Sequence, residues 1–352
     1  MKNSLPEYFI EKRLMSEYTS VEVKNGELKM KVLSLGGIIT NLYTPDKNGK
    51  SGDIVLWNNS SQDYFKNCAY MGAIIGRVAS RIANAKATLN GETLKLTKNE
   101  KAFSNCLHGG AKGFDKQNWS IEKISGHSFK GVSLNYLSKD GQEGFPGNLN
   151  ITVNYKLTDE RQLLIEYTAF TDAPTLCSLT NHSYFNLSAG KSPTILEHEM
   201  RVSADFYTPL DKKFRPTGEI LSVKNTPLDF SKPKVLGPAI LENKEFFEIS
   251  NGGLDHNYVL PNANGALLKA ASLRDPVSGR VMDVYTDQPG LQVYTSNFLD
   301  GSILGKFGKP YNKYAAICFE TQKLPDAANF GHFPTIELYP DQVYSATTVY
   351  AF

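Results

Sequence analysis

The chain has 352 residues, of which 41% are hydrophobic and 21% are charged, proportions that are ordinary for a globular protein. Its 38 basic and 36 acidic residues are interspersed and leave a formal net charge of only +2. This pattern gives no sign of a nucleic-acid groove or a membrane-binding face, so we expect neither partner. Tyrosine (18) and phenylalanine (19) are plentiful, which suits strands and also suits stacking on the C–H faces of sugars.

Cysteine usage and the N-terminal sequence indicate the compartment. Cys68, Cys106, Cys177 and Cys318 lie far apart without a C-x-x-C pair, so no structural zinc site is expected. Each lies among apolar neighbours, which predicts buried free thiols in a reducing compartment. The first 18 residues lack the apolar core of a signal peptide, and no later run could span a bilayer. A cytoplasmic protein fits best, and a mature form made without its leader is the alternative.

Alternating apolar and polar residues predict strands along most of the chain. Leu28, Met30 and Val32 alternate with lysines, and the segment 151–157 alternates in the same way. Turn dipeptides recur at Asn25-Gly26, Asn48-Gly49, Asn90-Gly91, Asp140-Gly141, Ser278-Gly279 and Asp300-Gly301. Stretches with helical periodicity are few, and short helices are expected only near Ser61–Tyr64 and Val235–Lys244.

No linker rich in proline, serine or glycine divides the chain, and no repeat of fixed period is present. The simplest prediction is all-β: residues 1–352 form a single domain, a large antiparallel β-sandwich with few short helices. A sandwich of this size has a sheet broad enough to present a concave face, where a ligand site would lie.

The segment SLTNHSYFNL, residues 178–187, is the first candidate for chemistry. It places His182 in a short polar island between apolar residues, where an imidazole can become a proton donor tuned near neutral pH. The alternative is a core histidine that is hydrogen-bonded to a backbone carbonyl.

Two further segments place polar side chains among apolar ones. Arg77 and Arg81 lie four residues apart in GRVASRIANAKATLNG, where an arginine could bind sugar hydroxyls or simply pair with a carboxylate. His108 precedes Gly109 and Gly110, which predicts a tight loop that a ligand can approach. A turn histidine without a partner would have the same local sequence.

Two carboxylates and an amide complete the set. Asp255 follows a Gly-Gly bend and could accept hydrogen bonds from neighbouring hydroxyls, or it could form an Asx-turn with its own backbone. Glu320 ends an apolar strand, and burial there would raise its pKa toward the range of a general base. The alternation in LQVYTS predicts that Gln292, Tyr294 and Ser296 share one face.

Together these groups suit acid–base chemistry on a polyhydroxylated neutral ligand. A metal centre could use His108, His182, Asp255 and Glu320, but none of them has the local spacing that marks such a site. The sequence also lacks the G-x-S-x-G of a serine hydrolase and a glycine loop that could cradle a phosphate.

In this order, the segments resemble those of the aldose 1-epimerase (galactose mutarotase) family. The similar segments are LGGIITNLYTPDKNGK, GRVASRIANA, CLHGGAKGFDKQNW, TNHSYFNL, GGLDHNY, QPGLQVYTSNFLDG and ETQKLPD with the later FP and Y. They cover nearly the whole chain, and their order is more informative than any one of them. The segment NFGHFPTIELYP departs from the sequence pattern that is usual in the family.

The resemblance implies a β-sandwich of the galactose-mutarotase type that interconverts the α and β anomers of free hexoses without a cofactor or a metal. It implies that His182 donates a proton to the ring oxygen and that Glu320 takes the proton of the anomeric hydroxyl. The sugar-binding positions that it implies are Arg81, His108, Asp255, Gln292, Tyr184 and Ser80. Ser80 is a departure, because asparagine is common there, and its shorter hydroxyl loses the amide donors.

Three rival functions have distinct signatures. A mutarotase for hexose 6-phosphates would add basic residues around the phosphate, and the motif segments carry no such cluster. A non-catalytic sugar-binding protein would be expected to lack His182 or Glu320. A retaining glycosidase would need two facing carboxylates, a role that Asp255 and Glu320 could fill. The sequence carries no signal for the preferred hexose, and none that separates a monomer from a homodimer.

Overall fold

The computed structural model describes residues 18–66, 69–100, 102–262 and 265–352. Within these ranges the chain is built mainly of antiparallel strands, so the predicted fold class is confirmed. The two α-helices in the described ranges, α2 (Ser61–Lys66) and α3 (Leu236–Leu241), lie in the two segments that the sequence predicts as helical. No helix in the described ranges is long and apolar enough to cross a membrane.

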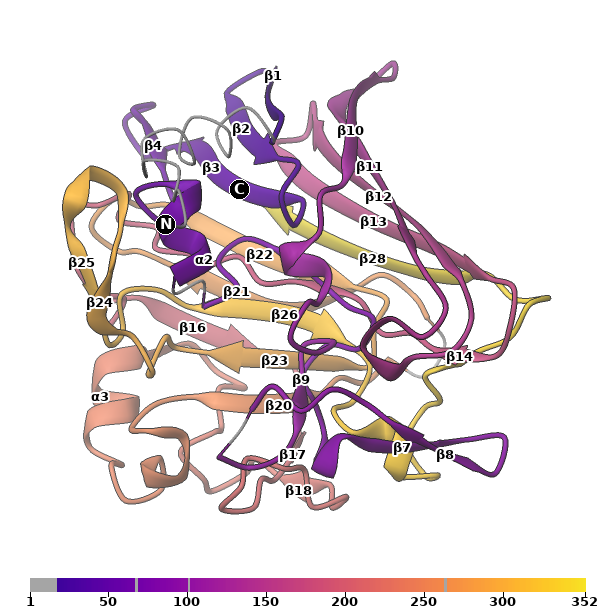
Figure 1. The fold of residues 1–352 in the computed structure, drawn as a ribbon. Coiled ribbons are helices and arrows are strands. Elements are labelled where there is room, and N and C mark those ends of the chain that lie inside the picture. The colour runs from indigo at the N-terminus through magenta and orange to yellow at the C-terminus, as the bar shows by residue number, and fades with distance from the viewer. Residues whose placement is uncertain (1–17, 67–68, 101, 263–264) are drawn as a thin grey trace, which may run out of the picture.

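The largest sheet has nine strands, and every pairing within it is antiparallel. In spatial order they are β10 (Ser120–Ser125), β11 (Phe129–Ser138), β12 (Leu149–Thr158), β13 (Gln162–Thr171), β28 (Tyr344–Ala351), β22 (Val281–Thr286), β21 (Leu268–Arg274), β16 (Glu199–Val202) and β19 (Lys234–Val235). The C-terminal strand β28 therefore lies in the middle of the sheet, between β13 and β22 (Figure 1).

A five-stranded antiparallel sheet lies over one part of the large sheet (Figure 1). Its strands, in order, are β18 (Leu221–Ser222), β17 (Phe206–Thr208), β20 (Asp255–Val259), β23 (Gly290–Tyr294) and β26 (Cys318–Gln322). The two sheets touch directly, since the Tyr350 hydroxyl of β28 donates to the Phe319 carbonyl of β26 at 2.9 Å. One apolar cluster contains residues of both sheets, as expected for a sandwich.

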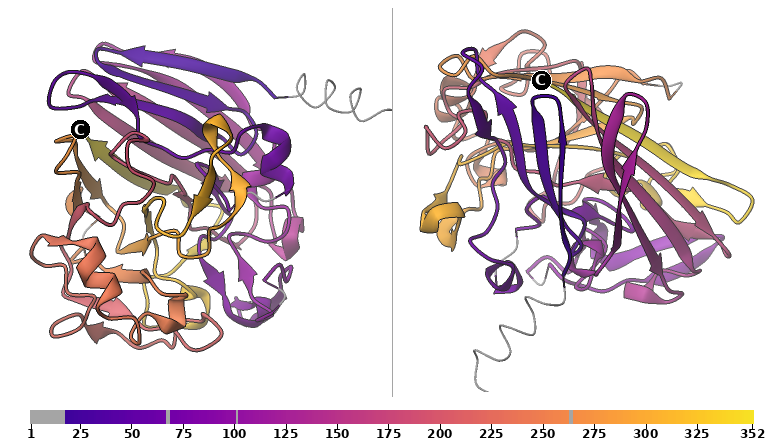
Figure 2. Two further views of the ribbon diagram at one scale, coloured as in Figure 1. Left: turned by 90° about the vertical axis from the view of Figure 1, so that its left-hand side faces the viewer. Right: turned by 90° about the horizontal axis from the view of Figure 1, so that it is seen from above.

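Smaller units complete the fold. A four-stranded sheet of β1 (Ser20–Asn25), β2 (Leu28–Leu33), β3 (Ile38–Pro45) and β4 (Ser51–Asp53) packs through β1 against β10, β11 and β12 (Figure 2). Two-stranded ribbons pair β5 (Ile74–Ile75) with β15 (Thr180–Asn181), β6 (Arg81–Ile82) with β9 (Cys106–Leu107), β7 (Lys86–Leu89) with β8 (Glu92–Lys95), β14 (Thr175–Leu176) with β27 (Glu337–Leu338), and β24 (Asp300–Leu304) with β25 (Pro310–Asn312). Short 3₁₀ turns occur at Ala83–Ala85, Phe114–Lys116, Gln142–Gly144, Glu248–Ser250, Lys306–Gly308 and Ala327–Asn329.

Most of the local sequence signals are confirmed. In β2 the side chains of Leu28, Met30 and Val32 are buried while the lysines between them are not, and β12 alternates likewise. Turn dipeptides connect the predicted hairpins, with one exception. Asp300-Gly301 opens β24 instead, because Asp300 pairs with Asn312 across the ribbon.

Cysteines behave as buried apolar residues. Cys106, Cys177 and Cys318 are buried free thiols, as predicted, and Cys68 lies outside the described residues. Burial raises the thiol pKa of all three, to about 12 for Cys106, so they remain protonated.

Strands β20, β23 and β26 of the five-stranded sheet have two different faces. Tyr258, Leu291 and Val293 enter the apolar cluster. Their neighbours along the strands point the other way, because side chains alternate in an extended chain. The register pairs Asn257 with Gln292 and Gln292 with Glu320, so polar side chains stand side by side on the second face.

The two arginines of the segment 76–91 have separate roles. Arg77 is 2% exposed and belongs to the fold. Its guanidinium donates to the carbonyls of Ser138, Lys139, Pro146 and Gly147 and to the hydroxyls of Ser138 and Thr175. Burial lowers its pKa to about 10, which still leaves it charged at neutral pH. Arg77 thus ties the end of β11 to the loop before β12 and to β14.

Arg77→Ala should destabilise the fold by about 3–5 kcal/mol, because several buried carbonyls would lose their donor. Equilibrium urea unfolding would measure this, with Arg274→Ala as the control. Arg274 forms a surface ion pair with Glu199 at 3.1 Å, and its removal should cost no more than about 0.5 kcal/mol. Equal stability of the two variants would show that the Arg77 network is not structural.

Candidate active site

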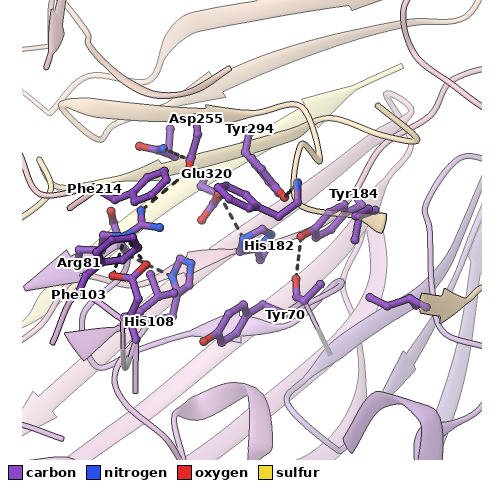
Figure 3. A pocket seen from close by; sticks show the side chains of 18 of the residues that line it. Tyr70, Arg81, Phe103, His108, His182, Tyr184, Phe214, Asp255, Tyr294 and Glu320 are labelled. Atoms are coloured by element: carbon purple, nitrogen blue, oxygen red, sulfur yellow. Dashed lines mark hydrogen bonds and ion pairs between the residues drawn. The ribbon is translucent and has the colours of Figure 1, made fainter. Parts of the chain in front are cut away.

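A cavity of about 320 Å³ opens on the polar face of the five-stranded sheet, near the lower end of the range for small-molecule sites (Figure 3). All eight residues that the sequence and the resemblance predict for the site line this one cavity: Ser80, Arg81, His108, His182, Tyr184, Asp255, Gln292 and Glu320. Residues more than 200 positions apart in the chain are therefore brought together at a single place.

His182 and Glu320 lie next to each other in the cavity wall (Figure 3). His182 directly follows β15, where its N–H donates to the Ala73 carbonyl and its carbonyl accepts from Gly72, both at 2.9 Å. Glu320 lies in the middle of β26 rather than at its end. The imidazole Nε2 is 3.5 Å from the Glu320 Oε1, so the ring faces a carboxylate instead of a backbone carbonyl.

Burial controls the protonation of this pair. His182 is 4% exposed and Glu320 is 2% exposed. Desolvation lowers the pKa of His182 to about 3. Desolvation also raises the pKa of Glu320 well above its ordinary value, and Asp255 adds to this rise while Arg81 opposes it. Both shifts favour the uncharged forms, an imidazole beside a carboxylic acid, over an imidazolium beside a carboxylate.

His108 is held in one tautomer by the backbone of Ser80. The Ser80 N–H donates to His108 Nδ1 at 3.2 Å, and the His108 N–H donates to the Ser80 carbonyl at 2.9 Å. Because Nδ1 accepts a hydrogen bond, the ring proton is on Nε2. Desolvation and the neighbouring positive charges lower the His108 pKa well below its usual value. His108 is therefore a neutral donor, and the alternative of a histidine without a partner is wrong.

The loop that carries His108 needs its glycine. Gly109 has φ +84°, and a Cβ there would lie 1.8 Å from the carbonyl oxygen of Gly76. The predicted tight loop is confirmed, and it exists because only glycine allows this close approach.

Arg81 and Asp255 form the polar end of the cavity. Arg81 Nε is 3.0 Å from Glu100 Oε1, and its Nη1 is 4.0 Å from Asp255 Oδ2. Burial opposes the charge of Arg81, but Asp255 and Glu100 raise its pKa overall. Asp255 also accepts from Gln292 Nε2 at 2.6 Å, so the Asx-turn alternative is wrong.

Tyr184 contributes chiefly its ring. The ring stacks on His182 with centroids 5.1 Å apart and planes at 15°, while the hydroxyl donates to the Ala69 carbonyl at 2.8 Å. Tyr184 therefore fixes the plane of the imidazole, which decides where Nε2 points.

Some pocket residues had no signal in the sequence. Glu100 lies in a lysine-containing stretch that is typical of a solvated loop, and Phe103, Phe214 and Phe298 lie in loops without periodicity. Ser296 was predicted to share a face with Gln292 and Tyr294, but this is wrong. Strand β23 ends at Tyr294, so the alternation stops there, and the Ser296 hydroxyl instead accepts from the Ala316 N–H.

A metal ion would find its ligands at His108, His182 and Glu320, whose donor atoms lie within 4.8 Å of one another. Zinc bonds nitrogen and oxygen ligands at about 2.0–2.2 Å, so the three groups would have to close around it. Arg81 in the same cavity adds an unfavourable positive charge.

The geometry of the cavity defines the class of the site. It is a hollow on a β-sandwich that holds an imidazole facing a carboxylate, with an arginine, a second carboxylate and an amide for hydroxyl groups. Such a set suits proton transfer on a small polar ligand.

Comparison with known proteins identifies the family. The sequence profile described as aldose 1-epimerase matches residues 19–351. The chain is 41% identical to galactose mutarotase of Bos taurus over 94% of this chain and 93% of the relative. It is 33% identical to aldose 1-epimerase of Escherichia coli K12 over 93% of each chain. The solved structure of an aldose epimerase homologue from C. elegans superimposes with a TM-score of 0.85 at 32% identity, covering 95% of this chain and 98% of that one. The chain belongs to the aldose 1-epimerase family and is an isomerase.

Proposed function

We propose that this cavity interconverts the α and β anomers of free hexoses by opening and reclosing the sugar ring. The contact between His182 and Glu320 is the observation that carries the proposal. The ring oxygen and the anomeric hydroxyl are bonded to the same carbon, so the acid and the base that serve them must be neighbours. Two groups 3.5 Å apart on a water-poor face meet this requirement.

In the proposed reaction, His182 as imidazolium donates a proton to the ring oxygen while Glu320 as carboxylate accepts the proton of the anomeric hydroxyl. The C1–O5 bond breaks and an open-chain aldehyde forms. Rotation about C1–C2 presents the other face of the aldehyde, and the two groups reverse roles to close the ring. Each positioned acid or base contributes roughly 10²- to 10⁴-fold to the rate.

The working protonation state needs no proton from solvent. Imidazolium with carboxylate and imidazole with carboxylic acid hold the same single proton, so a proton shift within the pair converts one form into the other. Hydrogen bonds from the sugar hydroxyls and the nearby Arg81 favour the carboxylate form once the sugar has bound.

The remaining polar residues bind and orient the sugar. Arg81 and the Nε2–H of His108 supply donors where negative charge grows on oxygen. Asp255 accepts hydrogen bonds from hydroxyls, and Gln292 fixes its orientation through the 2.6 Å contact. Among the described residues that line the cavity, Arg81 is the one lasting cation, and it already faces two carboxylates. A free hexose suits this balance better than a hexose 6-phosphate.

Two features support further proposals about the whole chain. The three buried free thiols support a cytoplasmic, reducing location. The apolar cluster that runs from Val23 to Tyr350 supports a single domain.

Glu320→Gln should lower kcat for α-glucose or α-galactose by about 10³-fold, because the amide cannot accept the anomeric proton. Polarimetry measures the rate, and equilibrium binding of galactose should change less than about tenfold. Near-full activity of this variant would exclude the role given to Glu320.

The pH dependence distinguishes a proton-sharing pair from two independent groups. If the two groups titrated independently with ordinary pKa values, the imidazolium would be present below about pH 6.5 and the carboxylate above about pH 4.3. Activity would then fall above about pH 6.5. The pair has a lowered His182 pKa and a raised Glu320 pKa, so it gains its second proton only at low pH and loses its single proton only at high pH. We expect kcat/KM to stay flat from below pH 6.5 to the alkaline side of neutrality, after correction for uncatalysed mutarotation. A decline centred near pH 6.5 would contradict the shared proton.

Ser80→Asn should strengthen sugar binding. The residue lines the cavity at φ +59°, a left-handed conformation that asparagine adopts more readily than serine. The amide would add a donor, and one hydrogen bond corresponds to a roughly two- to tenfold lower KM. A severalfold higher KM in a stably folded variant would show that the serine is suited to this pocket.

Two rivals can be tested with the same protein. A hexose-6-phosphate mutarotase would prefer glucose 6-phosphate to glucose in polarimetry. A retaining glycosidase using Asp255 and Glu320 would release nitrophenol from aryl galactosides.

A further inference from the structure

Glu100 is a partly buried carboxylate in the cavity wall to which the proposed reaction gives no role. Its Oε1 lies 3.0 Å and its Oε2 lies 3.3 Å from the Nε of Arg81. The two side chains are only 15% and 12% exposed, respectively. Removing one partner of an ion pair this poorly hydrated costs more free energy than breaking a surface ion pair, because the remaining charge is left unpaired away from water. The two side chains therefore hold each other in a fixed geometry.

The Glu100 carboxylate is itself held in place. Asn105 Nδ2 donates to Glu100 Oε2 at 2.7 Å and to the Lys213 carbonyl at 3.0 Å. Asn105 Oδ1 accepts from the Asn84 N–H at 3.2 Å. The contacts join three separate segments of the chain, so the position of the carboxylate is fixed before any ligand binds.

The loop is fastened a second time beside Glu100. Asn99 pairs with the backbone of Leu107, accepting from its N–H at 2.7 Å and donating to its carbonyl at 2.8 Å. Leu107 immediately precedes His108. The same loop thus secures the arginine and the histidine that are proposed to bind the sugar.

Arg81 is consequently held from three sides. Glu100 accepts a hydrogen bond from the Arg81 Nε–H, and the Phe214 ring lies 5.3 Å from the guanidinium carbon. Asp255 Oδ2 lies 4.0 Å from Nη1. The 4.0 Å separation is an ion-pair distance that is too long for a hydrogen bond. Arg81 is therefore kept just short of Asp255, so the carboxylate and the guanidinium can both bind the same ligand.

We propose that Glu100 is a positioning residue that keeps Arg81 from closing onto Asp255 and aims its terminal N–H groups at the sugar. Without Glu100, the guanidinium would move to its other carboxylate neighbour and occupy the acceptor that sugar hydroxyls need. The inference rests on the proposed function, and it adds to that function a residue that sets substrate affinity without reacting.

A double-mutant cycle tests the inference. Glu100→Gln alone should lower kcat/KM for galactose about 10- to 100-fold, mainly through KM, because Arg81 loses a charged hydrogen-bond partner. In an Arg81→Met background the same change should cost less than about threefold, since there is no guanidinium left to position. A higher activity of the double variant than of Arg81→Met would also support the inference. Arg81→Met leaves the Glu100 carboxylate without its cation, and Glu100→Gln removes that unpaired charge.

Controls separate this role from simple stabilisation. Glu199→Gln removes the surface ion pair with Arg274 and should leave kcat/KM unchanged. Folded fractions measured by urea unfolding normalise every rate. If Glu100→Gln does not fold, Glu100→Asp replaces it, since it keeps the charge but withdraws the carboxylate by one methylene.

The outcomes are distinct. Equal losses from the Glu100 change with and without Arg81 would overturn the inference and indicate a direct sugar contact or a general effect on the fold. Wild-type kcat/KM in Glu100→Gln would overturn it as well. Failure of the proposed function has another signature, because the wild-type protein itself would then not accelerate mutarotation.

Discussion

The account depends on the alternation of side chains in three adjacent strands, β20, β23 and β26. One face of these strands supplies tyrosine, leucine, valine and phenylalanine to the apolar cluster that binds the two sheets together. The opposite face supplies Asp255, Gln292 and Glu320 to the cavity. The same hydrophobic contact that stabilises the sandwich therefore fixes the position of Glu320, and a shift of one residue in register would exchange the two faces.

Rigidity and burial together prepare the site for proton transfer. His182 is fixed by backbone hydrogen bonds on both sides of its Cα and by the stacked ring of Tyr184. Desolvation lowers the pKa of the imidazole and raises the pKa of the carboxyl, so it favours the uncharged form of each group. In water at neutral pH a glutamate carboxyl would instead be ionised. By excluding water, the fold therefore favours a carboxylic acid beside the imidazole in the cavity.

The fold class could be predicted because it rests on strong local signals, whereas the roles proposed for His182 and Glu320 rest on the resemblance to a family. Alternation and turn dipeptides predict antiparallel strands wherever one face is buried. His182 and Glu320 interrupt apolar runs, which made them candidates, but a core histidine would interrupt such a run in the same way. The order of the strands in the sheets could not be predicted, since it depends on contacts between segments that are distant in sequence, such as β13 with β28. Glu100 and Phe214 were missed for the same reason, because each lies in a polar loop and its place in the wall is set by tertiary contacts. Ser296 shows the limit of periodicity, which holds only while the strand continues.

A structure of the protein with bound galactose tests the central claim most directly, by the distances from His182 Nε2 and Glu320 Oε1 to the two oxygens on the anomeric carbon. The account predicts the ring oxygen within hydrogen-bonding distance of His182 and the anomeric hydroxyl within hydrogen-bonding distance of Glu320, with Arg81 and Asp255 on the other hydroxyls. A sugar whose anomeric carbon points away from both groups would contradict it.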